Sequence, residues 1–176
     1  LVKRKGMPAD YQAMFILHEG PIGYFDGSLK EIDYDDLHDE DAETNTDVGG
    51  WTGFTDKYWL TAMMPNQTEE YDYRFSASGT GEVRNYQSDY RGKAMLVDAG
   101  QSVENVTHFF AGAKRLGLLE QYSEELNVPH LDLAIDFGWF YFITKPFFHV
   151  IDFLYNLVGN FGIAIIIFTV CLRLCL

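Results

Sequence analysis

The sequence predicts a mainly β fold, an antiparallel sandwich, followed by two helices that favour a membrane. Turn-forming Gly, Ser and Asn residues separate short aromatic runs at intervals of 8 to 15 residues, a spacing typical of antiparallel strands rather than βαβ units. Residues 153–172 contain no charged side chain, whereas residues 1–138 hold 25 of the 26 acids. An acidic domain is therefore joined to an apolar tail within 176 residues.

Composition excludes several classes of protein. With 47% apolar residues the chain can bury a core, so it is not a disordered acidic tail. Its net charge of −13 argues against nucleic acid as a partner, because phosphate binding needs an excess of Lys and Arg.

The predicted sandwich occupies residues 1–130. In residues 11–34, aromatic runs are separated by Gly, a pattern typical of strands and tight turns. Residues 48–65 are also predicted to form strands, around a Gly-Gly-Trp turn. Three further strand-like runs cover residues 70–79, 81–100 and 101–112.

Residues 31–43 carry eight acids between two of these runs. A calcium loop is one reading, but the segment has neither the D-x-D-x-D-G spacing nor a Gly at the turning position. We therefore expect a solvated, mobile loop.

A short helix is predicted near residues 113–126, because Leu116, Leu119 and Tyr122 recur on one helical face. An extended connector, residues 131–143, then leads into the tail.

The tail begins with an amphipathic helix over residues 144–158, with Pro146 in its first turn. Four polar residues fall on one narrow face, namely Lys145, His149, Asp152 and Asn156. Apolar side chains cover the rest, so we expect this helix to lie in a membrane interface with its polar stripe toward water or headgroups. Docking of the helix on the acidic domain is the alternative.

A second apolar helix is predicted over residues 161–176, after Gly159 and Asn160 end the first. The 15 residues from Gly162 extend about 22 Å, whereas a bilayer core is ~30 Å thick, so we expect a truncated transmembrane helix and a chain that is a fragment of a longer protein. Cys171 and Cys175 lie one turn apart in this apolar setting and are expected to pack without chemistry.

Arg173 stands out because a guanidinium near mid-membrane costs at least ~2.5–3.5 kcal/mol. One interpretation places it in a wet intramembrane cavity, with Thr169 on the same face. The other makes it an orientation signal that snorkels to cytosolic headgroups. The sequence alone leaves both open.

No pattern indicates catalysis. The five histidines have no metal-ligand spacing, no nucleotide-binding or nucleophile motif occurs, and no carboxylate pair is singled out for glycoside hydrolysis. We expect no enzymatic activity, cofactor or metal.

The run LDLAIDFGWFYFITKPFFHVIDFLYNLVGNFGIAIIIFTVCLRLCL, from Leu131 to Leu176, resembles the start of the insertase core of the YidC/Oxa/Alb family, in its bacterial YidC branch. GGWTGFTDKYWLTAMMP and HFFAGAK are similar to segments of that family's large periplasmic domain. The resemblance implies a partial periplasmic β-supersandwich, an interfacial helix at the outer face of the inner membrane, and the start of the second transmembrane helix.

The resemblance also implies a function, that of a membrane protein insertase and chaperone working alone or with the Sec translocon. Arg173 and Thr169 then match a hydrophilic groove that receives substrate. Expected partners are nascent membrane proteins, the Sec translocon with its accessory subunits, and the lipid bilayer. The expected location is the bacterial inner membrane, multi-pass in the longer protein, with residues 1–140 in the periplasm.

Two alternatives from other classes remain. One is a membrane-anchored periplasmic sandwich that binds or processes sugars, since such folds are shared with carbohydrate enzymes. The other is a structural subunit that tethers a partner through its acidic domain. In both, Arg173 should be replaceable by Leu.

Overall fold

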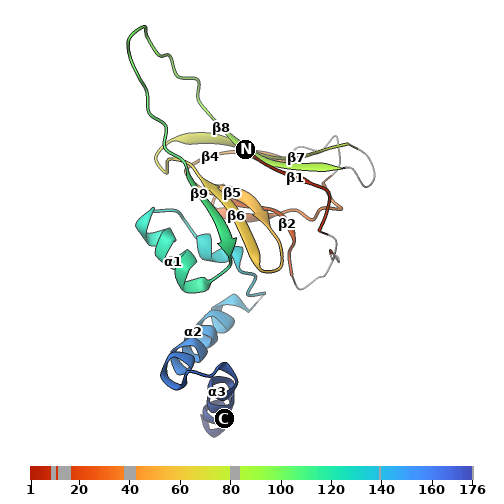
Figure 1. Ribbon diagram of the computed structural model, residues 1–176, viewed down its shortest axis with the longest axis vertical. Coiled ribbons are helices and arrows are strands. Elements are labelled where there is room, and N and C mark those ends of the chain that lie inside the picture. Colours follow the sequence, from red (N-terminus) through yellow and green to blue (C-terminus); the bar gives the residue numbers. More distant parts are fainter. Residues whose placement is uncertain (9–10, 12–16, 38–42, 80–83, 139, 176) are drawn as a thin grey trace. The chain divides into compact units, whose positions relative to one another are not determined.

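The computed structural model describes residues 1–176 except 9–10, 12–16, 38–42, 80–83, 139 and 176 (Figure 1). The chain divides into two compact units, Leu1–Asp136 and Phe137–Leu176, which we call unit 1 and unit 2 and describe separately.

Unit 1 contains two antiparallel sheets, as the turn spacing predicts (Figure 1). The four-stranded sheet has the order β1 (Val2–Lys5), β8 (Asn85–Gly92), β7 (Glu70–Ser78) and β4 (Glu43–Val48). The five-stranded sheet has the order β3 (Ser28–Glu31), β2 (Gly20–Phe25), β5 (Trp51–Thr55), β6 (Trp59–Met64) and β9 (His108–Ala113). Every pair of neighbouring strands is antiparallel.

An aromatic core fills the space between the sheets. Strand β7 alternates strictly between buried and less buried positions, which turns one of its faces inward. The Tyr73 ring stacks on Phe25 with ring centroids 4.6 Å apart. A buried hydrogen bond of 2.7 Å joins the hydroxyls of Thr52 in β5 and Ser88 in β8 and satisfies both within the core.

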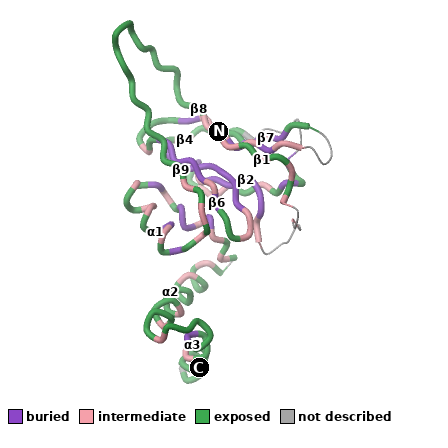
Figure 2. The backbone as a smooth tube through the Cα atoms, viewed as in Figure 1, coloured by how far each residue is buried: buried purple, intermediate pink, exposed green. Residues whose placement is uncertain are grey.

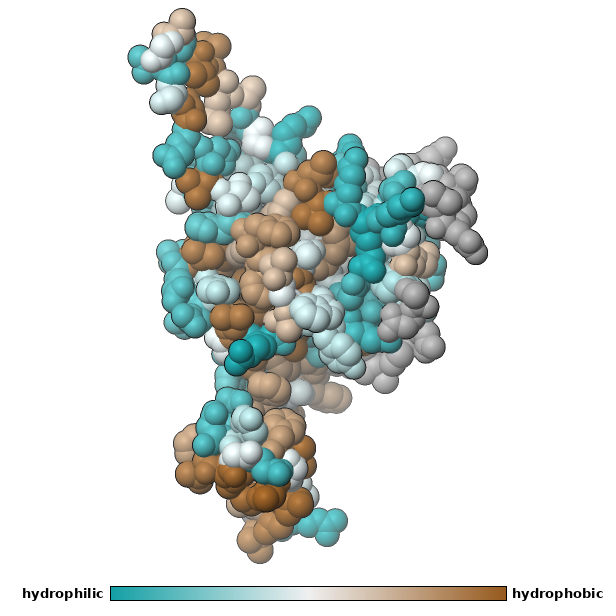
Figure 3. All heavy atoms as spheres, viewed as in Figure 1, coloured by the Kyte–Doolittle hydropathy of each residue, from teal (hydrophilic) through white to brown (hydrophobic). Residues whose placement is uncertain are grey.

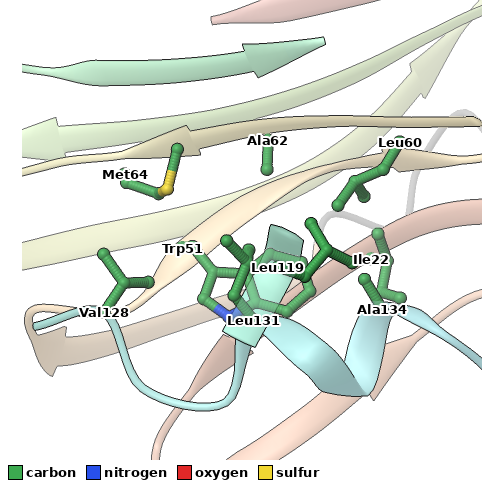
Figure 4. Packing of buried hydrophobic residues seen from close by; sticks show 9 residues of the cluster. All are labelled: Ile22, Trp51, Leu60, Ala62, Met64, Leu119, Val128, Leu131 and Ala134. Atoms are coloured by element: carbon green, nitrogen blue, oxygen red, sulfur yellow. The ribbon is translucent and has the colours of Figure 1, made fainter. Parts of the chain in front are cut away.

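A second core covers the outer face of the five-stranded sheet (Figure 4). Helix α1 (Leu116–Glu125) and the 3₁₀ helix η2 (Leu131–Ala134) supply Leu119 and Leu131, both fully buried against Trp51. The Trp51 indole N–H donates to the Pro129 carbonyl at 2.9 Å, so the segment between the two helices is tied to the sheet. The predicted helix is confirmed, with Leu116 and Leu119 as its buried residues.

The Gly-Gly-Trp turn between β4 and β5 depends on its glycines. Gly49 and Gly50 have φ angles of +69° and +94°, which glycine adopts without steric cost. The Gln67 side chain bonds both backbone groups of Gly50, at 2.8 Å to N and 3.0 Å to O, and the buried Tyr73 hydroxyl donates to the Gly49 carbonyl.

The acidic segment after β3 differs from the expected solvated loop. Tyr34 and Leu37 are buried in the core between the sheets, with 0% and 2% of their surface exposed. Their neighbours Asp33, Asp35 and Asp36 are exposed at the surface. The prediction was wrong here because a charge count overlooks two apolar side chains spaced one helical turn apart; residues 38–42 lie outside the described residues.

The strand-like run over residues 81–100 is a strand only as far as Gly92. Residues 93–107 instead form an exposed arm that carries Leu96, 89% exposed, and returns to β9 (Figure 2).

Unit 2 is a pair of helices, α2 (Tyr141–Val158) and α3 (Phe161–Cys175). Gly159 ends α2 in the left-handed conformation, φ +69°, and the Asn160 side chain accepts a hydrogen bond from the Ile163 N–H at 3.2 Å, as an N-cap does. The predicted break at these two residues is confirmed.

We expect Trp51→Phe to lower the free energy of unfolding by about 2–4 kcal/mol, because it leaves the Pro129 carbonyl without its donor and a gap in the core. Urea unfolding of the chain in detergent, followed by circular dichroism, measures this. Trp59→Phe is the matched control; Trp59 is 61% exposed, so a change within about 0.5 kcal/mol is expected. Equal effects of both substitutions would contradict the anchoring role of Trp51.

Candidate functional site

Helix α2 carries the predicted polar stripe. Lys145, His149, Asp152 and Asn156 recur every three or four residues along one continuous helix and therefore share a face. Two contacts run along that face: Lys145 Nζ lies 3.1 Å from the Tyr141 hydroxyl, and Asn156 Nδ2 donates to Asp152 Oδ2 at 3.3 Å. The ammonium of Lys145 also lies 5.5 Å from the Tyr141 ring centroid, a cation–π distance.

The helix begins at Tyr141, three residues before the expected start at residue 144. Pro146 consequently lies inside the helix rather than in its first turn, and the Phe142 carbonyl lacks the N–H donor that another residue would supply. The first turn is supported by Thr144, whose hydroxyl donates to the Phe140 carbonyl at 3.1 Å.

Apolar side chains occupy the remaining faces of α2 and most of α3, and many are exposed. Phe142, Phe153 and Leu157 are each about 70% exposed, and Leu174 of α3 is 82% exposed. Brown surface dominates unit 2 in Figure 3. A protein surrounded by water seldom exposes so much apolar surface. The surface of unit 2 is therefore suited to apolar surroundings.

The two helices pack through aromatic rings and one small residue. The Phe147 and Phe168 rings meet edge-on at 5.1 Å, and the Tyr155 and Phe161 rings at 5.9 Å. Ala164 is fully buried, which lets the helices approach closely.

Thr169 and Arg173 lie four residues apart in α3 and therefore on one face. The Thr169 hydroxyl donates to the Ile165 carbonyl at 2.8 Å, so its oxygen retains capacity only as an acceptor. Arg173 is exposed in the last turn of the helix. Within the part of the chain that the structure describes, no helix combines the length and the apolarity needed to cross a membrane.

A pocket on the four-stranded sheet bears on the sugar-binding alternative. Its volume is about 340 Å³, and its lining includes Tyr73, Asp72 and Asp89. The Tyr73 ring is fully buried and stacked on Phe25, so it offers no face to a sugar. Asp72 is engaged by Arg91 at 3.0 Å.

A charged cluster at one end of the five-stranded sheet was not predicted. Lys114, directly after β9, donates from Nζ to the Thr55 hydroxyl at 2.9 Å. Burial lowers the pKa of Lys114, while the nearby carboxylates of Asp136, Asp56 and Glu19 act in the opposite direction. These residues lie far apart in the sequence, so no local pattern could have brought them together. Among the described residues, no group of three or more His, Cys, Asp or Glu is arranged to hold a metal ion.

Comparison with known proteins gives one consistent result. Residues 1–150 match the family described as the YidC periplasmic domain. Thr169 and Arg173 lie beyond that matched range.

The chain is also similar to curated proteins named membrane protein insertase YidC. It is 45% identical to that of Agrobacterium fabrum (strain C58 / ATCC 33970) over 162 residues, which cover 91% of this chain and 27% of the relative. Identity is 42% to the protein of Rickettsia bellii (strain OSU 85-389) over 175 residues, 99% of this chain and 31% of the relative. It is 44% to that of Sinorhizobium medicae (strain WSM419), over 92% of this chain and 27% of the relative. The chain thus spans less than a third of these relatives, which are named for insertion and not for a catalysed reaction.

The lowered pKa of Lys114 predicts a pH dependence of stability. In the alkaline range the folded chain releases this proton at a lower pH than the unfolded chain, whose pKa is near 10.5, so the free energy of unfolding rises with pH across that interval. We expect Lys114→Met to reduce that rise in urea titrations between pH 8 and 10.5, relative to the unsubstituted chain. Lys93→Met, at a side chain 73% exposed, should leave it unchanged. An identical reduction by both substitutions would show that burial of Lys114 has no part in it.

Proposed function

Because this chain belongs to the YidC family of membrane protein insertases, we propose that it is part of a bacterial inner-membrane protein that inserts and helps fold other membrane proteins. The observation that carries the proposal is the similarity along nearly the whole chain to relatives named for this activity, α3 included. The exposed apolar surface of unit 2 supports the proposal independently.

Each unit has a place in this proposal. Unit 1, with the sandwich over residues 1–130, lies in the periplasm as part of a β-supersandwich, and the connector of residues 131–143 leads to the membrane. Helix α2 lies in the outer interface, with its stripe of Lys145, His149, Asp152 and Asn156 toward headgroups and water. The exposed Phe140 and Phe142 suit the aromatic belt of that interface. Helix α3 enters the bilayer as the beginning of a transmembrane helix.

Arg173 and Thr169 contribute to a hydrophilic groove that the rest of the longer protein completes. A hydrated, positively charged groove shortens the apolar barrier and attracts acidic segments of an incoming protein. The apolar segment of the substrate then moves into lipid, and its burial supplies the free energy without a nucleotide. The substrates are nascent membrane proteins, and the Sec translocon with its accessory subunits is the expected partner.

Substitution of Arg173 tests the groove. We expect Arg173→Leu in the full-length protein to slow insertion of single-span substrates with acidic translocated segments at least about tenfold, an effect of roughly 1.4 kcal/mol. Arg173→Lys, which retains the positive charge, should insert them nearly normally. Pulse-labelling with protease protection in cells depleted of the unsubstituted protein measures the rate.

Normal insertion by a stable Arg173→Leu protein would refute the role of the charge and favour the orientation reading. Photo-crosslinking from residue 169 during synthesis of such a substrate gives a second readout. A crosslink to the nascent chain supports the proposal that α3 lines a substrate groove. Crosslinks to lipid alone would indicate that α3 only anchors the protein in the membrane.

The interfacial placement of α2 has its own test. We expect Val150→Asp to reduce partitioning of the chain into phospholipid vesicles by roughly tenfold or more, because it places a charge on the apolar side of the helix. Asn156→Asp adds the same charge within the polar stripe and should change partitioning little. Vesicle co-sedimentation compares them, and equal losses would mean that the stripe does not face water.

A further inference from the structure

The start of helix α2 places a lysine among three aromatic rings. The Phe137 ring, just before the helix, meets the Tyr141 ring edge-on at 5.5 Å and the Phe148 ring at 6.4 Å. Tyr141, Lys145 and Phe148 are spaced four and three residues apart, so they share one face of α2. Lys145 therefore lies between the two rings that Phe137 contacts, and we call the three rings the aromatic frame.

The ammonium of Lys145 is held beside this frame. Its Nζ lies 3.1 Å from the Tyr141 hydroxyl and 5.5 Å from the centroid of the Tyr141 ring. Lys145 is half-buried, and Phe148 beside it is 41% exposed. A lysine in apolar surroundings buries its stem and extends its ammonium to the nearest polar boundary. Here that boundary is the first part of the polar stripe.

The two charges of α2 lie in different halves of the helix. Lys145 carries the positive charge near the start, and Asp152 carries the negative charge seven residues further on, about 10 Å along the axis. Asp152 accepts a hydrogen bond from Asn156, still further from Lys145, at 3.3 Å. The start of the stripe is therefore complementary in charge to an anion.

The interfacial placement of α2 identifies the class of anion. At the level of a helix that lies in the interface, the anions are the phosphodiesters of lipid headgroups. An ammonium binds phosphate as a point charge with up to three N–H donors, and a Tyr hydroxyl supplies a donor beside it. The Phe142 carbonyl, which lacks an N–H donor at Pro146, also needs water nearby. Both features suit the level of water and headgroups.

We propose that Lys145 and Tyr141 bind the phosphate of a phospholipid headgroup, and that Phe137 and Phe148 hold this pair in position. The contact sets the depth at which α2 enters the interface. Anionic phospholipids such as phosphatidylglycerol bind more tightly, because their headgroup has no cation that competes for the phosphate. The inference rests on the proposed function, which places α2 in the interface, and adds to it a ligand and the residues that bind it.

Solid-state NMR tests the contact directly. The chain, labelled with ¹⁵N in its lysine side chains, is bound to vesicles of phosphatidylcholine and phosphatidylglycerol in a phosphate-free buffer, so that lipid is the source of every phosphate. Recoupling to ³¹P should dephase part of the lysine ammonium signal. That part should disappear in Lys145→Met and persist in Lys93→Met, which removes a lysine of unit 1 whose side chain is 73% exposed.

Vesicle co-sedimentation gives a second measurement. Lys145→Met keeps most of the side-chain length and removes the charge, so binding to vesicles that contain phosphatidylglycerol should weaken about fivefold. Lys145→Arg keeps the charge and should bind nearly as the unsubstituted chain does. Tyr141→Phe keeps the ring and removes the hydroxyl, and should weaken binding roughly twofold. Lys93→Met changes the net charge equally and should have little effect.

An absence of dephasing, dephasing that persists in Lys145→Met, or equal binding of Lys145→Met and the unsubstituted chain would overturn the inference. The ammonium would then serve another anion, such as an acidic segment of a substrate. These outcomes differ from a failure of the interfacial placement. If Val150→Asp weakens partitioning more than Asn156→Asp does while Lys145→Met has no effect, α2 lies in the interface without this lipid contact.

Discussion

The anchoring of Trp51 holds together the part of unit 1 that leads to the tail. A five-stranded sheet that packs against another sheet on one face must cover its second face as well. Here α1, η2 and the segment between them provide that cover, and the Trp51 indole fixes the segment through the Pro129 carbonyl. The same side chain sits at the centre of the outer core, in contact with residues of both helices (Figure 4). The position of the last residues before unit 2 therefore depends on this outer core and on the Trp51 hydrogen bond within it.

The inter-sheet core shows how an acidic chain keeps a compact interior. Tyrosine and phenylalanine rings fill the space between the sheets, and polar groups that enter it, such as Thr52 and Ser88, are paired with each other. Even the most acidic segment contributes Tyr34 and Leu37 to this core. The carboxylates beside these two residues, those of Asp33, Asp35 and Asp36, are exposed to water, whereas Glu19 and Asp132 are buried elsewhere in unit 1.

Unit 2 differs from unit 1 in that its apolar side chains are mostly exposed rather than buried. Most of the large apolar side chains of its two helices are exposed, and their mutual packing includes two aromatic ring pairs and the buried Ala164. Such a hairpin suits surroundings that are themselves apolar, and in the placement proposed above its polar stripe faces headgroups and water. A single chain that contains both kinds of unit is suited to working where water meets lipid.

The sequence by itself determined the features that depend on neighbours along the chain. The antiparallel strands follow from turn spacing, α1 from Leu116 and Leu119, and the break between α2 and α3 from Gly159 and Asn160. The shared faces of the α2 stripe and of Thr169 and Arg173 follow from helical periodicity alone, although their proposed roles rest on family membership. Tertiary structure decided the burial and the contacts that involve residues far apart in the sequence.

It buried Tyr34 and Leu37 within an acidic run and placed Lys114 beside Thr55. It also left Phe109 of the edge strand β9 exposed. The physical reason is that periodicity assigns a side chain to a face of its own element, whereas only the packing of separate elements determines whether that face meets protein or solvent.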